Sequence, residues 1–218
     1  MHNPSLKLFL VIIVALEITF TTRLYPNIII IALALAYLLY HHVQLRHLTW
    51  LLLITAIPAL AIFTTIAFFS PQHSVYFGLV LVTRIYVYVT AGSAVSLTTS
   101  PLQLARSLEQ NCHLPSKFAY GVLAALNLLP KIQQEVKTIR IAGQLRGVTL
   151  HWWSPTLYFK AILAASQWAD QLAQAMESHG FVEGASRTAV RTIVITKQDW
   201  FSFIGSLVLV QIIVIALS

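Results

Sequence analysis

Apolar residues gather in five long stretches along the chain, at residues 6–22, 24–40, 50–69, 75–97 and 200–218. Each stretch is close to the roughly 17–25 residues that an α-helix needs to cross the hydrocarbon core of a bilayer. The pattern therefore predicts five transmembrane helices, four in the first half of the chain and one at its end.

The segment between the fourth and fifth stretches is polar and predicts three further helices. The first begins at Pro101, with Ser100 as its N-cap. The second covers 115–147, with a kink expected at Pro130. The third covers 155–179, again after a serine-proline start signal. The spacing of polar and apolar residues in these helices is amphipathic rather than uniformly apolar.

Composition supports a membrane protein, because 57% of the residues are hydrophobic and only 10% are charged, against about 25% charged in soluble domains. Basic side chains concentrate in the polar segment, and the connection 41–49 adds one arginine and three histidines. Since cytoplasmic loops carry an excess of Lys and Arg, both regions are predicted to be cytoplasmic. The predicted fold is an all-α integral membrane protein of about five spans, with three cytoplasmic helices inserted before the last span.

This topology places the N-terminus in the cytoplasm and the C-terminus outside. The first stretch has some features of a signal peptide, but Glu17 interrupts it and no small-x-small cleavage site follows, so it is interpreted as a span. The predicted domains are a membrane domain of four spans (1–98), a cytoplasmic domain with long helices ending near Gly147 and Gly180 (99–196), and a final transmembrane helix (197–218).

Two charged side chains, Glu17 and Arg84, fall inside predicted spans. Ionisable groups are costly in a bilayer and usually face other protein groups or a cavity. The two could pair and join the first and fourth spans, one could line a substrate path, or each could reach toward an interface. A structural role is favoured.

Small residues recur at a spacing of four on the second and third polar helices. Such residues let two helix backbones approach closely, although alanine is also common in any helix. A tight crossing of the two helices is predicted through Gly121, Ala125, Ala161, Ala165, Ala169 and Ala173.

Both long polar helices end with a basic or imidazole side chain followed by glycine, at Arg146–Gly147 and His179–Gly180. One interpretation is a helix cap, in which glycine takes the left-handed conformation and the cation offsets the helix dipole. The other is that each helix end is a contact for an acidic groove on a partner protein.

The chain contains no recognisable catalytic or nucleotide-binding motif, such as a P-loop, G-x-S-x-G or H-E-x-x-H. His41, His42 and His47 are the nearest approach to a metal site, but they have no carboxylate or thiolate neighbours. A loop of amphipathic side chains at the level of the lipid headgroups is the favoured interpretation.

Several segments together resemble the transmembrane T component of energy-coupling factor (ECF) transporters. They are LTTSPLQLARSLEQNCHLPSKFAY, LNLLPKIQQEV, AGQLRG and AMESHGF, all within 97–182. Members of that family carry two short Ala-Arg-Gly signatures at the ends of two long coupling helices. The matching positions here are Leu145, Arg146 and Gly147, and then Ser178, His179 and Gly180.

The resemblance implies a non-catalytic subunit in the plasma membrane of a prokaryote. Two ABC-type ATPase subunits on separate chains would bind ATP and Mg and receive the ends of the crossed coupling helices in their grooves. The motion would pass to a small membrane S component that binds a vitamin, a vitamin precursor or a transition-metal ion. No cofactor and no nucleic acid are implied for this chain.

The signatures depart from the family pattern, because leucine replaces the first alanine and Ser-His replaces Ala-Arg in the second. Histidine lacks the fixed charge of arginine at neutral pH, so the two ATPase contacts are predicted to be unequal, with Arg146 the stronger. Two other interpretations of the function stay open. The chain could be the permease of an ordinary ABC transporter with its own substrate path, or an intramembrane enzyme.

Overall fold

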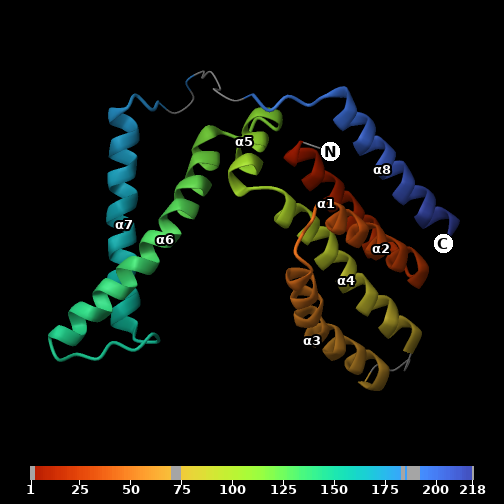
Figure 1. Cartoon of the computed structure of the whole chain (residues 1–218), viewed down its shortest axis with the longest axis horizontal. Helices are drawn as coiled ribbons and strands as arrows, with labels where there is room; N and C mark the ends of the chain where they lie inside the picture. The colour runs from red at the N-terminus through yellow and green to blue at the C-terminus, as the bar shows by residue number, and fades with distance from the viewer. Residues whose placement is uncertain (1–2, 70–74, 183–184, 186–191, 218) are drawn as a thin grey trace. The chain divides into compact units, whose positions relative to one another are not determined.

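A computed structural model describes residues 3–69, 75–182, 185 and 192–217 of the chain. Over these residues the chain forms eight α-helices and no strand (Figure 1), which confirms the all-α prediction. The helices belong to two compact units. The first, the membrane unit, comprises Met1–Ser107 and Ile193–Ser218, and the second, the polar unit, comprises Leu108–Thr192.

Each of the five apolar stretches forms one helix of the membrane unit. These helices are α1 (Pro4–Phe20), α2 (Leu24–Tyr40), α3 (Leu45–Phe69), α4 (Val75–Thr98) and α8 (Lys197–Ala216). Helices α3, α4 and α8 are long and apolar enough to cross a membrane. Helices α1 and α2 have 17 residues each, about 25 Å at 1.5 Å per residue, a little less than the ~30 Å hydrocarbon core. The chain is a helical membrane protein; that α1 and α2 also span stays a prediction.

Helix α3 begins at Leu45 rather than at residue 50, so the predicted connection 41–49 is shorter than expected. The reason lies at the end of α2, where His42 adopts a left-handed backbone conformation with φ of 53°. The N–H of Val43 then donates to the carbonyl of Leu38 at 3.3 Å. This turn reverses the chain within 41–44.

The core of the membrane unit lies between α1, α2, α4 and α8, which run alongside one another (Figure 1). Its buried side chains are Val14, Ile18, Ile30, Val87 and Val210, and α3 packs on α4. Large apolar side chains on the outside remain uncovered: Ile57 and Ile215 are 73% and 72% exposed. Outward apolar surface of this kind is expected where helices face lipid.

The three polar helices are α5 (Pro101–Asn111), α6 (Ser116–Leu145) and α7 (Pro155–Ser178). Helix α5 starts as predicted, because the hydroxyl of Ser100 accepts the backbone N–H of Gln103 at 3.3 Å. The division between the two units falls within α5, after Ser107. Helix α6 continues past Pro130 as one helix of 30 residues.

Candidate functional site

Helices α6 and α7 form an antiparallel pair in the polar unit, joined by the loop 146–154 (Figure 1). At one end of the pair, the ring of Tyr120 near the start of α6 meets the ring of Phe181 just past the end of α7. Their centroids are 6.2 Å apart and the rings are nearly perpendicular. At the other end, Leu150 in the loop is buried against Gly143 near the end of α6. The two helices therefore finish at opposite ends of the pair.

The end of α6 is a Schellman motif, a C-cap in which two N–H groups beyond the helix bond back to its last turn. Gly147 has a φ of 74°, and its N–H donates to the Gln144 carbonyl at 3.0 Å. The N–H of Val148 donates to the Gly143 carbonyl at 2.9 Å. These two bonds satisfy carbonyls that a helix end would otherwise leave unpaired.

The end of α7 repeats the motif. Gly180 has a φ of 81°, and its N–H donates to the Glu177 carbonyl at 2.9 Å. The N–H of Phe181 donates to the Met176 carbonyl, also at 2.9 Å. The predicted helix-cap role of both glycines is confirmed, and the partner-contact interpretation remains compatible with it.

The residues before the two glycines are presented to solvent. Leu145 is 85% exposed, and Arg146 and His179 are exposed C-cap residues. The hydroxyl of Ser178 bonds within its own helix, to the Ala175 carbonyl at 2.8 Å. Because α7 has 24 residues, its own two ends lie about 36 Å apart. The pair thus carries two similar exposed tips far apart, Leu145–Gly147 and Ser178–Gly180.

The predicted small-residue crossing is realised only in part. Ala161 is buried and Ala165 is half-buried, whereas the other members are exposed: Gly121, Ala125, Ala169 and Ala173. A Cβ at Gly121 would meet nothing within 4 Å, so the prediction that Gly121 permits a close crossing is wrong for this chain. At that end of the pair the rings of Tyr120 and Phe181 meet edge to face.

The two intramembrane charges do not pair with each other within the described residues. The guanidinium of Arg84 on α4 donates to the carbonyl of Thr21, the C-cap of α1, at 2.7 Å. The side-chain amide of Gln211 on α8 donates to the Glu17 carboxylate on α1. A helix C-terminus offers unpaired carbonyls, which accounts for the partner of Arg84. Each charge joins α1 to another helix, so the structural interpretation is supported without the ion pair.

A buried polar cluster at the start of α1 was not predicted. The carboxamide oxygen of Asn3 accepts from the hydroxyls of Ser5 at 2.7 Å and Ser107 at 2.9 Å. The backbone N–H of Ser5 also donates to the Ser107 hydroxyl at 3.2 Å. The Asn3–Pro4 pair is a recognisable helix start, but nothing around Ser107 indicates that α5 is anchored there.

The start of α8 was also missed. Thr196 and Asp199 form a reciprocal capping box, with the Thr196 hydroxyl 2.8 Å from the Asp199 carboxylate. The sequence signal was available, since Thr-x-x-Asp has the capping-box spacing. No group of three or more His, Cys, Asp or Glu side chains among the described residues is placed to hold a metal ion.

Comparison with known proteins finds a family model that covers most of the chain. The family model described as CbiQ, cobalt transport protein, matches residues 1–190. The chain belongs to the CbiQ family. The match covers the four helices that open the membrane unit and both helices of the candidate site.

Within the CbiQ family, similar curated relatives are named energy-coupling factor transporter transmembrane protein EcfT. The relative from Limosilactobacillus fermentum is 30% identical over 138 residues, covering 56% of this chain and 51% of its own length. The one from Heliobacterium modesticaldum is 31% identical over 131 residues, covering 53% and 49%. The one from Leuconostoc gelidum is 26% identical over 181 residues, covering 73% and 68%. The chain spans about half the length of the first two relatives.

Proposed function

We propose that this chain is the energy-coupling T component of an ECF-type importer. It would receive motion from two ABC-type ATPase subunits and pass it to a small membrane S component that binds the substrate. The observation that carries the proposal is the pair of matching Schellman ends of α6 and α7, which present Arg146 and His179 at opposite ends of one antiparallel pair. Two similar tips suit two similar partner subunits.

The chemistry of the tips supports a protein contact. An exposed arginine at a helix C-terminus is held by a rigid cap, so an acidic groove binds it with little loss of backbone freedom. Leu145 adds exposed apolar surface beside Arg146. Arginine is among the residues enriched at interface hot spots.

In this proposal the chain is not itself an enzyme. ATP and Mg are bound by the ATPase subunits, and the substrate, a vitamin, vitamin precursor or transition-metal ion, is bound by the S component. The N-terminus and the polar unit face the cytoplasm in the plasma membrane, and the C-terminus lies outside, as the distribution of basic residues favours.

Co-purification tests the proposal directly. The chain, affinity-tagged and extracted from its native membrane, is expected to bring down two ATPase subunits and one small hydrophobic protein, identified by mass spectrometry. A chain that binds a vitamin or a metal ion without these partners would instead be a permease with its own substrate path. A chain that turns over a lipid alone would be an enzyme.

The same preparation tests the inequality of the two tips. Arg146→Ala is expected to reduce ATPase recovery more than His179→Ala, because a fixed positive charge is lost only in the first case. Lys131→Ala, at an exposed cation in the middle of α6, is the matched control and should leave recovery unchanged. Equal losses from Arg146→Ala and His179→Ala would contradict the inequality.

A further inference from the structure

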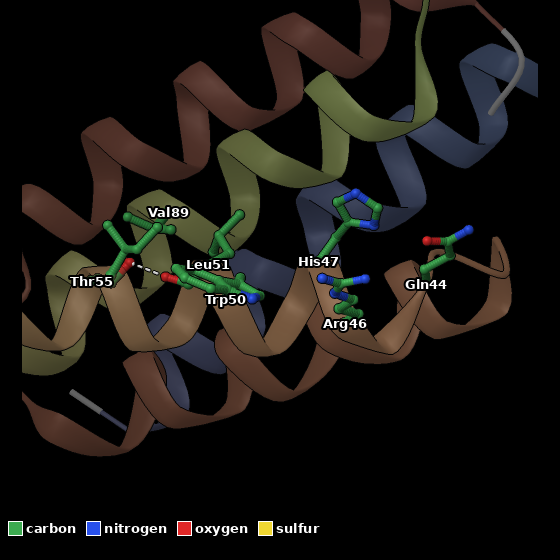
Figure 2. A pocket seen from close by; sticks show the side chains of 8 residues that line it. Gln44, Arg46, His47, Trp50, Leu51, Thr55 and Val89 are labelled. Atoms are coloured by element: carbon green, nitrogen blue, oxygen red, sulfur yellow. Dashed lines mark hydrogen bonds between the residues drawn. The ribbon is translucent and has the colours of Figure 1, made fainter.

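An open groove runs along the first half of α3 in the membrane unit, with a volume of about 630 Å³. Its polar side chains, Gln44, Arg46 and His47, lie toward the start of the helix (Figure 2). Trp50 and Leu51 lie next along the groove (Figure 2). The groove is therefore cationic and polar at one end and apolar along the rest.

In the apolar part of the groove the hydroxyl of Thr55 is satisfied within its own helix. Thr55 lies at the end away from Arg46 (Figure 2), and its hydroxyl donates to the Leu51 carbonyl at 2.7 Å. The remaining lining side chains, Ile54 and Val89, are aliphatic. A ligand in this part of the groove needs no polar groups, which suits a hydrocarbon chain.

The polar end has a cation without an internal counter-ion. The Arg46 guanidinium makes no hydrogen bond or ion pair within the described part of the chain, and no carboxylate is among the residues that line the groove. Arginine binds phosphate oxygens through two parallel N–H donors. His47 and Gln44 add N–H donors beside it. The polar end is thus complementary to a phosphate group.

The length of α3 places this polar end at the membrane surface. Its 25 residues extend about 37 Å, against a hydrocarbon core of ~30 Å, so about one turn lies outside the core. The polar turn with Arg46 and His47 is the end suited to that position, because the other end of α3 is Phe68–Phe69. Trp50 then lies at the interface, where tryptophan is enriched.

From this juxtaposition we propose that the groove is a binding site for an anionic phospholipid. The phosphate of the headgroup bonds to Arg46 and His47, and one acyl chain lies along Trp50, Leu51 and Ile54. Basic pockets beside transmembrane helices bind anionic headgroups in this way. The site belongs to the membrane unit alone and does not depend on the proposed ATPase contacts.

The test uses the purified full chain in nanodiscs that contain phosphatidylglycerol or phosphatidylcholine with brominated acyl chains. Bromine quenches nearby tryptophan. Phosphatidylglycerol is expected to quench more than phosphatidylcholine at equal mole fraction, because the choline cation beside the phosphate is repelled by Arg46. The chain has five tryptophans. If Trp50→Phe removes the excess quenching, the excess comes from Trp50. Equal quenching by the two lipids, or an excess that survives Trp50→Phe, overturns the proposal.

Charge variants test the headgroup contact. Arg46→Gln should lower the preference for phosphatidylglycerol about tenfold, the factor expected for one lost charge-assisted hydrogen bond, and Arg46→Lys should retain part of it. Arg23→Gln is the matched control, because Arg23 is an exposed cation at the opposite end of α2. An equal fall in Arg23→Gln indicates nonspecific charge attraction and overturns the site.

Because the chain is tested without partners, the two proposals fail independently. A chain that recovers no ATPase subunits can still prefer phosphatidylglycerol. If the isolated chain shows no lipid preference and another protein is found bound along α3, that protein and not the lipid occupies the groove.

Discussion

Leu150 packs onto Gly143 so closely that a Cβ built at position 143 would lie 2.8 Å from the Leu150 Cδ1 atom. The Gly143 carbonyl also accepts the N–H of Val148, which closes the end of α6. The loop 146–154 thus crosses back over the helix that precedes it. This contact holds the tip Leu145–Gly147 in its exposed position.

Gly143→Ala is expected to destabilise the polar unit by about 1–3 kcal/mol, the usual cost of overpacking. The added Cβ would meet the buried Leu150 side chain and, at 3.1 Å, the carbonyl oxygen of Val148. These groups must shift to make room for it. This cost exceeds the ~0.5–1 kcal/mol that alanine gains over glycine within a helix. Limited proteolysis of the loop 146–154, followed with time, measures the effect, and faster cleavage is the expected result.

Gly121→Ala is the matched control for this substitution. It makes the same change in the same helix, but a Cβ there meets nothing within 4 Å. The expected result is unchanged or slightly slower cleavage, because only the helix-propensity gain remains. If both variants accelerate cleavage equally, the contact between Leu150 and Gly143 is not what holds the loop.

Gly147→Ala should weaken ATPase recovery although it removes no contact side chain. The backbone at position 147 has a φ of 74°, a conformation that costs a residue with a Cβ about 1–2 kcal/mol. Alanine therefore favours a different helix end and a different position for Arg146. Gly147→Asn should retain more recovery, because asparagine tolerates the left-handed conformation better. Co-purification of the ATPase subunits with each variant checks the order; equal recovery with Ala and Asn would show that backbone geometry at this tip is unimportant.

The fold class and the helix caps could be predicted from local signals alone. Apolar length predicted the membrane helices, and glycine after the last polar turn predicted the left-handed caps at Gly147 and Gly180. These features depend on residues near one another in the chain. The function of the tips as partner contacts stays a prediction, since it depends on surfaces that are not part of this chain.

Features set by tertiary arrangement could not be predicted in the same way. A charge in a span suggests an opposite charge as its partner, yet Glu17 accepts from Gln211 on the last helix and Arg84 binds a backbone carbonyl. The small-residue pattern did not show that Gly121 would have no atom within 4 Å of an added Cβ. The early start of α3 depended on His42, which takes a backbone conformation usually left to glycine.

The contact between Tyr120 and Phe181 is expected to couple the start of α6 to the end of α7 by about 0.5–1.5 kcal/mol, the range for perpendicular aromatic pairs. A double-mutant cycle with Tyr120→Leu and Phe181→Leu measures this term through thermal unfolding of the purified chain. The coupling should be positive, so the double variant loses less than the sum of the single variants. Phe118→Leu, at a ring that is 54% exposed, serves as the control and should combine additively with Phe181→Leu.

Gln211→Leu is expected to destabilise the membrane unit by about 1–3 kcal/mol, because it leaves the Glu17 carboxylate without its recorded side-chain donor. The second carboxylate oxygen of Glu17 is already buried without a partner among the described residues, so no internal group takes over. Combining Gln211→Leu with Glu17→Leu should recover most of the stability, since removing both members of a buried polar pair is far less costly than removing one.

Thermal unfolding of the purified chain in detergent compares these variants with Ser206→Ala, a control on the same helix. Among the described residues, the Ser206 hydroxyl bonds only within α8, to the Ser202 carbonyl at 2.7 Å and the Phe203 carbonyl at 3.0 Å. Its removal should therefore change the midpoint little. A double variant less stable than Gln211→Leu would show that Glu17 contributes through groups other than Gln211. In that case the Glu17 carboxylate would stabilise the membrane unit through a further contact besides the one that joins α1 to α8.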